Sequence, residues 1–448
     1  MSPLELKKEV AAGRLDTVIV ALPDMFGRLM GKRMAAGPFL EHALHEGTHG
    51  CSYLLTVNLE MDPLDGFRVA NWESGFGDFA LAPDPATLRV LPWHEKTALV
   101  LCDFRREDGT DVAEAPRAVL KRQLARLAKL GLSAQMAGEL EFYLFNQSYA
   151  DAWKAEYRGL APSSDYRIDY HVLQPGRDEA LLGDVRRMLP RAGIAVESSK
   201  GEWGRGQHEV NLVHAEPLRS ADDHVVFKHA VKELAARHGQ CASFMAKWCP
   251  SEAGSSCHVH LSLWKGKTPA LWDGGARDYS KYFRACLGGL MKYAPEFSLW
   301  FAPTINSYKR YQAGSWAPTK IAWARDNRTT GFRVVGAGTS ARIENRMPGA
   351  DANPYLTFAA MLAAALAGAE EGLDCGKPYE GNAYVDAKLP ALPGSLSEAA
   401  DLFEHSTLAR KVFGDGVVDF YVRHARLECA AYANAVTDWE KTRYFERI

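Results

Sequence analysis

Ionisable side chains occupy alternate positions of segments that otherwise have the composition of β-strands. In residues 137–145, Glu139 and Glu141 alternate with Leu140 and Phe142. Successive side chains of a strand point to opposite faces of a sheet, so this segment has one charged and one apolar face. Three further segments show the same pattern, and their polar residues are Glu209 and Asn211, then His258, His260 and Ser262, then Arg342, Glu344 and Arg346.

Each segment taken alone is also typical of an amphipathic strand with a solvated face. Neighbouring carboxylates on one face repel each other unless a cation lies between them. Carboxylates suit Mg²⁺ or Mn²⁺, and an imidazole favours Mn²⁺ slightly. We therefore expect a divalent-cation site built from five glutamates and one histidine, namely Glu139, Glu141, Glu202, Glu209, Glu344 and His258.

A basic block lies between residues 305 and 346, with two acidic residues in it, Asp326 and Glu344. Arginine predominates there, and its planar fork matches carboxylate and phosphate groups. The alternative interpretation of this block is a solvent-exposed run of charged residues without a binding role. Trp316, Trp323 and Phe332 interrupt the block, however, which makes a smooth exposed helix a poor fit. Metals beside arginines predict phosphoryl chemistry on an anionic substrate. The basic residues are Lys309, Arg310, Lys320, Arg325, Arg328, Arg333, Arg342 and Arg346.

Composition excludes several classes of protein. The 448 residues carry 53 Lys and Arg against 55 Asp and Glu, so a chain that coats nucleic acid is not expected. No apolar run reaches the roughly 18 residues of a membrane span, and 358–366 is expected to be a packed helix. The N-terminus has no apolar signal region, and the eight cysteines form no CxxC pair. A cytoplasmic protein with reduced thiols is expected.

Strand-like and helix-like segments predict an α+β fold. Residues 17–22 and 97–104 favour strands of a small N-terminal unit, and a polar turn at 106–110 suggests its end. A large mixed domain follows. Helices are expected over 2–12, 115–130, 178–192, 222–237, 395–404 and 415–438.

Six ordered motifs resemble the glutamine synthetase family: GELEFYLF, EWGRGQHEVNL, SCHVHLSL, FAPTINSYKR, RDNRTT and ARIENRMPGADANPY. The segments LPDMFGRLMGKRM, GDFALAPDPATLRVLPW and VTDWEKTRYFE extend the likeness over nearly the whole chain. The resemblance implies an N-terminal β-grasp domain, residues 1–106, and a catalytic domain, 107–448, with a curved antiparallel sheet flanked by helices. It also implies a homo-oligomer of stacked hexameric rings, often a dodecamer, with active sites shared between subunits.

The resemblance implies roles for individual residues. Glu141, Glu202 and Glu209 correspond to ligands of a first metal, and Glu139, His258 and Glu344 to those of a second, with two or three Mg²⁺ or Mn²⁺ ions per site. Gly254, His258, Arg310, Arg328 and Arg346 fall at the glutamate site. Arg328 and Arg333, with Glu139, fall where the phosphoryl group is transferred. Glu197, His260, Ser262, Arg333 and Arg342 fall at the ATP site. The implied reaction forms γ-glutamyl phosphate, which an amine then converts to an amide.

Two departures concern the amine. The family's catalytic glutamate is replaced by Trp316, with the register set by Ala317 and Pro318, and its ammonium-binding aspartate falls near Cys51. Ammonium that enters a site without a carboxylate loses its hydration shell and gains no ion pair in return. The indole of a tryptophan instead offers an apolar face to the substrate. With Tyr170, these residues predict a pocket for a hydrophobic alkyl or aryl monoamine, as in γ-glutamylamine ligases that start amine catabolism.

Alternatives are an ordinary glutamine synthetase, a γ-glutamylpolyamine synthetase and a non-enzymatic ring protein. Smaller departures affect the expected substrate contacts. Ala253 replaces a common asparagine, and Thr339 replaces a lysine on the nucleotide side. Tyr384 lies near the site at which some bacterial members are adenylylated, although the match around it is weak.

Overall fold

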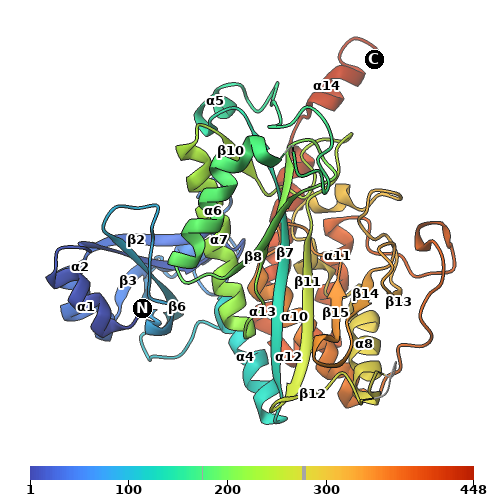
Figure 1. The fold of residues 1–448 in the computed structure, drawn as a ribbon, viewed down its shortest axis with the longest axis horizontal. Helices are drawn as coiled ribbons and strands as arrows, with labels where there is room; N and C mark the ends of the chain where they lie inside the picture. Colours follow the sequence, from blue (N-terminus) through green and yellow to red (C-terminus); the bar gives the residue numbers. More distant parts are fainter. Residues whose placement is uncertain (174, 275–278) are drawn as a thin grey trace.

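The computed structural model describes residues 1–173, 175–274 and 279–448 and contains two β-sheets (Figure 1). The smaller sheet has the order β2-β1-β6-β4-β3, with β5 added to β6. Its central pair, β1 and β6, is parallel, whereas the other pairs are antiparallel. The strands are β1 (Thr17–Pro23), β2 (Leu29–Ala35), β3 (Thr48–Cys51), β4 (Asp78–Pro83), β5 (Arg89–Val90) and β6 (Thr97–Arg105).

The larger sheet has the order β13-β14-β15-β11-β7-β9-β8, with β10 on β7 and β12 on β11. All its pairs are antiparallel except β13 with β14. Its strands are β7 (Ser133–Phe145), β8 (Val196–Gly201), β9 (Gln207–Leu212), β10 (Cys241–Ser243), β11 (Cys257–Lys265), β12 (Thr268–Pro269), β13 (Trp323–Arg325), β14 (Phe332–Val335) and β15 (Arg342–Asn345). In Figure 1 the long strands β7 and β11 run side by side through the middle of the molecule.

Helices pack around the large sheet, and the C-terminal helix α14 (Asp438–Tyr444) projects from the body (Figure 1). The helices of the body that follow the small sheet are α4 (Pro116–Lys129), α5 (Tyr149–Lys154), α6 (Glu179–Arg191), α7 (Pro217–Arg237), α8 (Lys281–Tyr293), α9 (Ser298–Phe301), α10 (Pro354–Glu371), α11 (Leu396–Glu404), α12 (Thr407–Phe413) and α13 (Asp415–Asn434). Those in the N-terminal part are α1 (Pro3–Ala11), α2 (Ala36–Pro38) and α3 (Leu44–Glu46).

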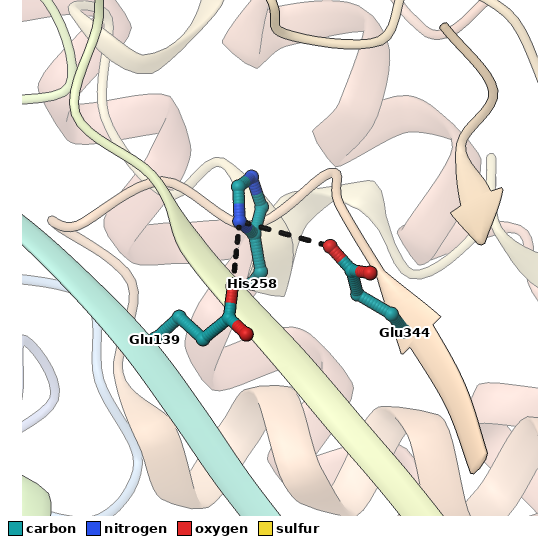
Figure 2. A group of neighbouring side chains, drawn as sticks. All are labelled: Glu139, His258 and Glu344. Atoms are coloured by element: carbon teal, nitrogen blue, oxygen red, sulfur yellow. Dashed lines mark hydrogen bonds and ion pairs between the residues drawn. The ribbon is translucent and has the colours of Figure 1, made fainter. Parts of the chain in front are cut away.

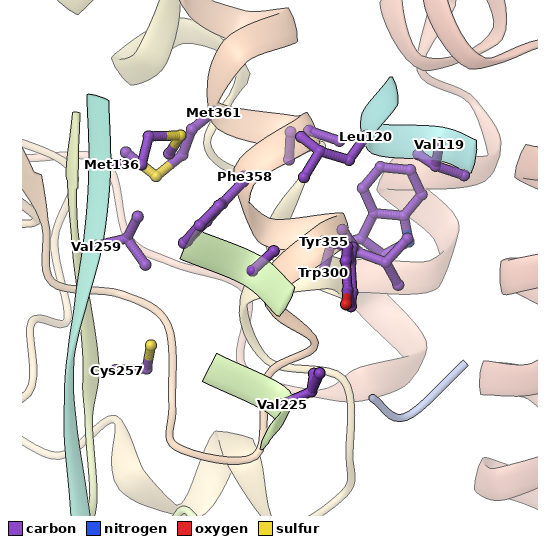
Figure 3. Close-up of a cluster of buried hydrophobic side chains, with 14 of the residues drawn as sticks. Val119, Leu120, Met136, Val225, Cys257, Val259, Trp300, Tyr355, Phe358 and Met361 are labelled. Atoms are coloured by element: carbon purple, nitrogen blue, oxygen red, sulfur yellow. The ribbon is translucent and has the colours of Figure 1, made fainter. Parts of the chain in front are cut away.

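The apolar face of the large sheet packs on helix α10. This helix is buried from Pro354 to Gly368 and contacts α8, α4 and α7. Figure 3 shows Phe358 of α10 between Val259 of the sheet and Leu120 of α4. The opposite face of the same strands is therefore left for polar side chains, as their alternation predicts.

A buried arginine joins the two parts of the chain. The guanidinium of Arg117, on α4, donates hydrogen bonds to Asp84 and Asp103 beside the small sheet and to Asp222 on α7, at 2.7 to 3.0 Å. It is 2% exposed, so its charge is compensated by these carboxylates rather than by water.

The fold class predicted from the sequence is confirmed: a β-grasp-like sheet is followed by a large sheet flanked by helices. Two helix bounds differ. Helix α7 begins at Pro217, five residues before the expected start, because Glu216 caps it. The expected final helix is divided, because α13 ends at Asn434 and Thr437 caps α14 in a capping box. The domain boundary at 106/107 stays a prediction, and it falls between β6 and α4.

None of the helices within the described residues is long and apolar enough to cross a membrane.

Candidate functional site

The register of the large sheet places polar residues of neighbouring strands directly opposite one another, in rows that run across the strands. Glu141 on β7 lies opposite Glu209 on β9, which lies opposite Lys200 on β8. In the next row, Glu139 lies between Asn211 of β9 and His258 of β11. In the third, Glu344 on β15 lies between His260 of β11 and Arg333 of β14. Directly paired residues share a face, so residues far apart in sequence form one polar surface.

Glu139, His258 and Glu344 form the first cluster (Figure 2). His258 Nδ1 lies 3.3 Å from Glu139 Oε2 and 3.8 Å from Glu344 Oε1. Burial, and next the charge of Arg346, lowers the pKa of His258 to about 4, so the imidazole is neutral near pH 7. Its Nε2 is buried without a hydrogen-bond partner. A neutral imidazole whose Nδ1 lies between two carboxylates is typical of a metal ligand.

Glu139 also accepts a hydrogen bond from His260. Arg342 Nε–H donates to His260 Nδ1 at 3.2 Å, so the ring carries its proton on Nε2 and donates it to Glu139 Oε1 at 2.9 Å. Burial alone would raise the pKa of Glu139, but the hydrogen bonds from His258 and His260 lower it well below the ordinary value. Glu139 is therefore ionised and held in one orientation.

Glu141, Glu209 and His258 form the second cluster, which shares the histidine with the first. Gln207 Nε2 and the backbone N–H of Ser256 donate to Glu141 Oε2 at 3.0 and 2.8 Å and so position it. Burial, and next the charge of Glu202, raises the pKa of both Glu141 and Glu209. The nearby positive charge is therefore too small to keep these crowded carboxyl groups ionised at their ordinary pKa.

Glu202 lies beside the second cluster but outside the group that shares one centre. Its carboxylate instead accepts a short contact from the ammonium of Lys200. Lys200 Nζ also lies 3.4 Å from Asp169 Oδ1 and 4.4 Å from the ring centre of Tyr170. The structure thus brings together five of the six predicted metal ligands and leaves Glu202 paired with a lysine.

The two clusters fit divalent cations by their chemistry. They offer carboxylate oxygens and one imidazole whose ligand atoms lie within 4.8 Å of one another in each group, and they hold a buried unpartnered nitrogen. Raised carboxyl pKa values are a second sign, because a cation between these groups would remove the repulsion. Metal coordination itself stays a prediction.

A cavity of about 540 Å³ opens over the clusters. Arg328, Arg333 and Arg346 line it. Arg333 Nη1 and Arg346 Nη1 donate to the two oxygens of Glu344, at 2.8 and 2.5 Å. Burial opposes ionisation of Glu344, but Arg346 and the two histidines hold its pKa below the usual range. Arg333 also donates to Asp326, so part of this positive charge is compensated, while the three guanidinium groups still present a wall suited to phosphate and carboxylate.

Gly254 and Arg310 lie next to each other at one side of this cavity. A Cβ on Gly254 would lie 2.6 Å from Arg310 Cγ and 2.7 Å from the carbonyl oxygen of Ala246, so only glycine fits there. Arg310 is 1% exposed and donates to Ser256 Oγ and to the carbonyls of Arg346 and Met347. Its guanidinium is thus engaged within the fold, whereas Gly254 lines the cavity.

Aromatic rings form another wall of the cavity. Trp316 and Trp203 meet edge to face with ring centres 5.4 Å apart, and Tyr170 lines the same cavity. Trp316 is 46% exposed and adopts φ of +66°, which is a strained conformation for a bulky residue. Such strain at a cavity wall favours a functional role for the indole. Asp169 and Ser315 add polar groups beside these rings.

Other predicted residues lie outside the cavity lining. Glu197 is exposed at a bulge of β8, and Ser262 accepts a hydrogen bond from Trp264 Nε1. Thr339 is exposed. Burial raises the pKa of Tyr384, whose hydroxyl oxygen is inaccessible, so modification there requires the surrounding loop to open.

Cys51 lies on β3 in the small sheet, outside this chain's own cavity. The sequence around it offers no nearby acid to replace the expected aspartate, but Asp78 on β4 lies directly opposite it. Strand pairing therefore places the carboxylate of Asp78 beside Cys51, although the two residues are far apart in the sequence.

Sequence reasoning missed Lys200, Asp169 and Trp203. Lys200 shares the strand alternation that revealed the glutamates, because it stands two residues before Glu202, and Trp203 directly follows that glutamate. Asp169 gave no signal, because it lies in a loop without periodicity.

Comparisons with known proteins agree with this geometry. The family profile for the glutamine synthetase catalytic domain matches residues 113–444. The chain is 50% identical over 446 residues to a γ-glutamylethanolamide synthetase of Streptomyces coelicolor, covering 99% of this chain and 96% of that protein. It is 36% identical over 453 residues to a glutamate–isopropylamine ligase of a Pseudomonas species, covering 99% and 98%. The structure of GmaS in complex with ADP superimposes with a TM-score of 0.86 at 28% identity, covering 98% of this chain and 99% of that one.

Proposed function

This chain belongs to the glutamine synthetase family, and from that premise we propose which amine it uses and how its residues act. It is an ATP-dependent glutamate–amine ligase. We propose that its amine is a hydrophobic monoamine, alkyl or aryl. The γ-carboxylate of glutamate attacks the γ-phosphorus of ATP, ADP leaves, and the amine displaces phosphate from γ-glutamyl phosphate to give a γ-glutamylamide.

The observation that carries this proposal is the aromatic wall of Trp316, Trp203 and Tyr170 at the cavity above the clusters. An indole at the position of the family's catalytic glutamate removes a carboxylate that would hold ammonium and adds apolar surface. Each buried methylene contributes about 0.8 kcal/mol, so such a wall favours a substituted amine over ammonia. One relative is named for a γ-glutamylethanolamide product and another for an isopropylamine substrate, and both names support a small alkyl amine over an aryl one.

Lys200 supports a monoamine over a polyamine. Its ammonium lies in the same cavity as the aromatic wall, against Tyr170 and Asp169. A second positive charge on the substrate would approach this ammonium, and like charges at short range oppose binding. The polar groups Asp169 and Ser315 favour a second candidate, an amine that carries a hydroxyl group.

Individual residues act on the substrates through charge. Glu139, His258 and Glu344 would hold one divalent cation, and Glu141 and Glu209 would hold another, with Glu202 nearby, because the single lone pair of the neutral His258 ring can serve only one ion. Bound cations supply electrostatic stabilisation of phosphate oxygens. We propose that Arg328 and Arg333 stabilise the transferring phosphoryl group and that Arg346 binds a carboxylate of glutamate. Arg342 and His260 orient Glu139 beside the ATP site.

A second subunit would complete the amine pocket. Cys51 and Asp78 are neighbours on the small sheet, outside this chain's own cavity, so they reach a pocket only from an adjacent copy. We propose a ring oligomer in which the small sheet of one subunit faces the cavity of the next. Molar mass from light scattering tests this arrangement, and a monomeric active enzyme would exclude it. Cytoplasmic location stays a prediction.

An amine panel tests the proposal. The full-length protein with glutamate, ATP and Mg²⁺ is assayed for phosphate release with isopropylamine, ethanolamine, aniline, putrescine and ammonia, and the amide is identified by mass spectrometry. We expect the greatest kcat/KM with isopropylamine, and a preference for ethanolamine would favour the second candidate, an amine that carries a hydroxyl group. Ammonia turnover equal to the best amine would mean an ordinary glutamine synthetase. A preference for putrescine would mean a polyamine ligase, and no glutamate-dependent turnover would mean a non-enzymatic protein.

A further inference from the structure

Lys200 occupies an unusual place for a cation. It stands on β8 directly opposite Glu209, and its ammonium contacts Glu202 and approaches Asp169. Its side chain is 23% exposed, so most of its charge is screened by carboxylates rather than by water. The ammonium therefore lies beside the second cluster, paired with Glu202 and close to Asp169.

The pairing explains why Glu202 stands apart. Glu141, Glu209 and His258 share one centre, whereas the Glu202 carboxylate is turned to Lys200. A divalent ion at that centre and the ammonium of Lys200 would repel each other, because like charges a few ångströms apart oppose binding strongly in a partly buried site. Either the ion binds with the lysine still on Glu202, at reduced affinity, or the lysine moves.

Asp169 is positioned to receive the lysine. Its carboxylate is 3.4 Å from Lys200 Nζ and 30% exposed, and the ring of Tyr170 lies beside the ammonium at 4.4 Å. A small side-chain movement would exchange the contact with Glu202 for a closer one with Asp169, without breaking the β8–β9 ladder. The displaced ammonium would remain compensated by a carboxylate and an aromatic face.

We infer that Lys200 is a resident cation that competes with the divalent ion for Glu202, and that Asp169 accepts the Lys200 ammonium when the ion binds. Lys200 and Asp169 are thus positioning residues that set the affinity of the second cluster for metal. The inference rests on the proposed metal role of Glu141 and Glu209.

Manganese binding to the cation-free full-length protein tests the exchange without catalysis, by titration calorimetry and by loss of the free Mn²⁺ signal in electron paramagnetic resonance. Lys200→Gln removes the competitor, so we expect binding about tenfold tighter. Asp169→Asn removes the acceptor, so we expect binding about tenfold weaker. Because Asp169 acts through Lys200, the double variant is expected to bind as tightly as Lys200→Gln alone.

Two further variants make the result specific. Lys200→Arg keeps the charge, so its affinity is expected to stay near that of the wild type. Lys267→Gln removes a positive charge from an exposed turn, and its affinity is expected to be unchanged. Circular dichroism confirms that every variant is folded before titration.

The outcomes separate the exchange from the proposed metal site. Wild type that binds no Mn²⁺ overturns the metal role of the second cluster itself. Wild type that binds Mn²⁺ while Lys200→Gln binds no more tightly overturns the competition and leaves the metal site in place. A double variant weaker than Lys200→Gln would mean that Asp169 contacts the ion directly, which overturns its role as acceptor.

Discussion

Binding of a divalent cation should release protons, because two carboxyl groups of the second cluster hold them in the cation-free protein. Burial and the charge of Glu202 raise the pKa of Glu141 and Glu209 above the ordinary value of 4.5. Near pH 7 these carboxyls retain protons that a metal ligand must lose. We therefore expect release of roughly one to two protons for each ion bound at this cluster at pH 7.

Calorimetry measures this number directly. Mn²⁺ is titrated at pH 7 in two buffers with different heats of ionisation, and the change in apparent enthalpy between the buffers gives the protons released. Glu209→Gln removes one of the protonated carboxyls, so its proton count should fall by about one. A wild-type enthalpy that is the same in both buffers would refute the reasoning, as would a count that Glu209→Gln leaves unchanged.

The same shift predicts how stability depends on pH. The folded cation-free protein keeps protons on Glu141 and Glu209 that the unfolded chain releases above about pH 4.5. The native state then binds more protons than the unfolded state, so these groups make the free energy of unfolding fall as pH rises from that value through their raised pKa. Saturating Mn²⁺ should remove this contribution, and urea unfolding at several pH values with and without the ion measures it.

Three substitutions extend these tests. Trp316→Glu restores a carboxylate, so the ratio of kcat/KM for isopropylamine to that for ammonia should fall by at least about tenfold; an unchanged ratio would remove Trp316 from the amine pocket. Glu344→Ala removes a carboxylate shared by two arginines and a candidate cation site, so glutamate-dependent phosphate release should fall about a hundredfold or more, and full activity would contradict that role. Arg117→Met leaves buried carboxylates without their cation, so urea unfolding should show a loss of about 3–5 kcal/mol, whereas a loss below 1 kcal/mol would mean that water screens them.

Much of the site can be predicted from the alternation of polar and apolar residues along single strands. Alternation along 137–145 and 257–263 placed Glu139, Glu141 and His258 on polar strand faces, and the structure has these strands as β7 and β11. The resemblance of the motifs to one family predicted both the architecture and the grouping of Glu139 with His258 and Glu344, which the structure brings together. Helix bounds were less accurate where a cap rather than the apolar period decides the end, as at Glu216 and Thr437.

Other features depend on contacts between distant parts of the chain. The pairing of Cys51 with Asp78 and the approach of Asp169 to Lys200 have no counterpart in sequence spacing. Glu202 belongs to the predicted metal set, yet in the structure its carboxylate is engaged by Lys200.

Local pattern alone is enough to show which side chains share a strand face, because that alternation is a property of the extended backbone and needs no partner. The motifs spread along the sequence also indicated the family, which the family profile confirms. Which strand faces meet depends on the folding of the whole chain. Strand register joins Glu139 to His258 across 119 residues, and loop packing brings Asp169 to the cavity. Register follows from burying the apolar faces of β7 and β11 against α10 (Figure 3), which is a property of the whole chain rather than of any one segment.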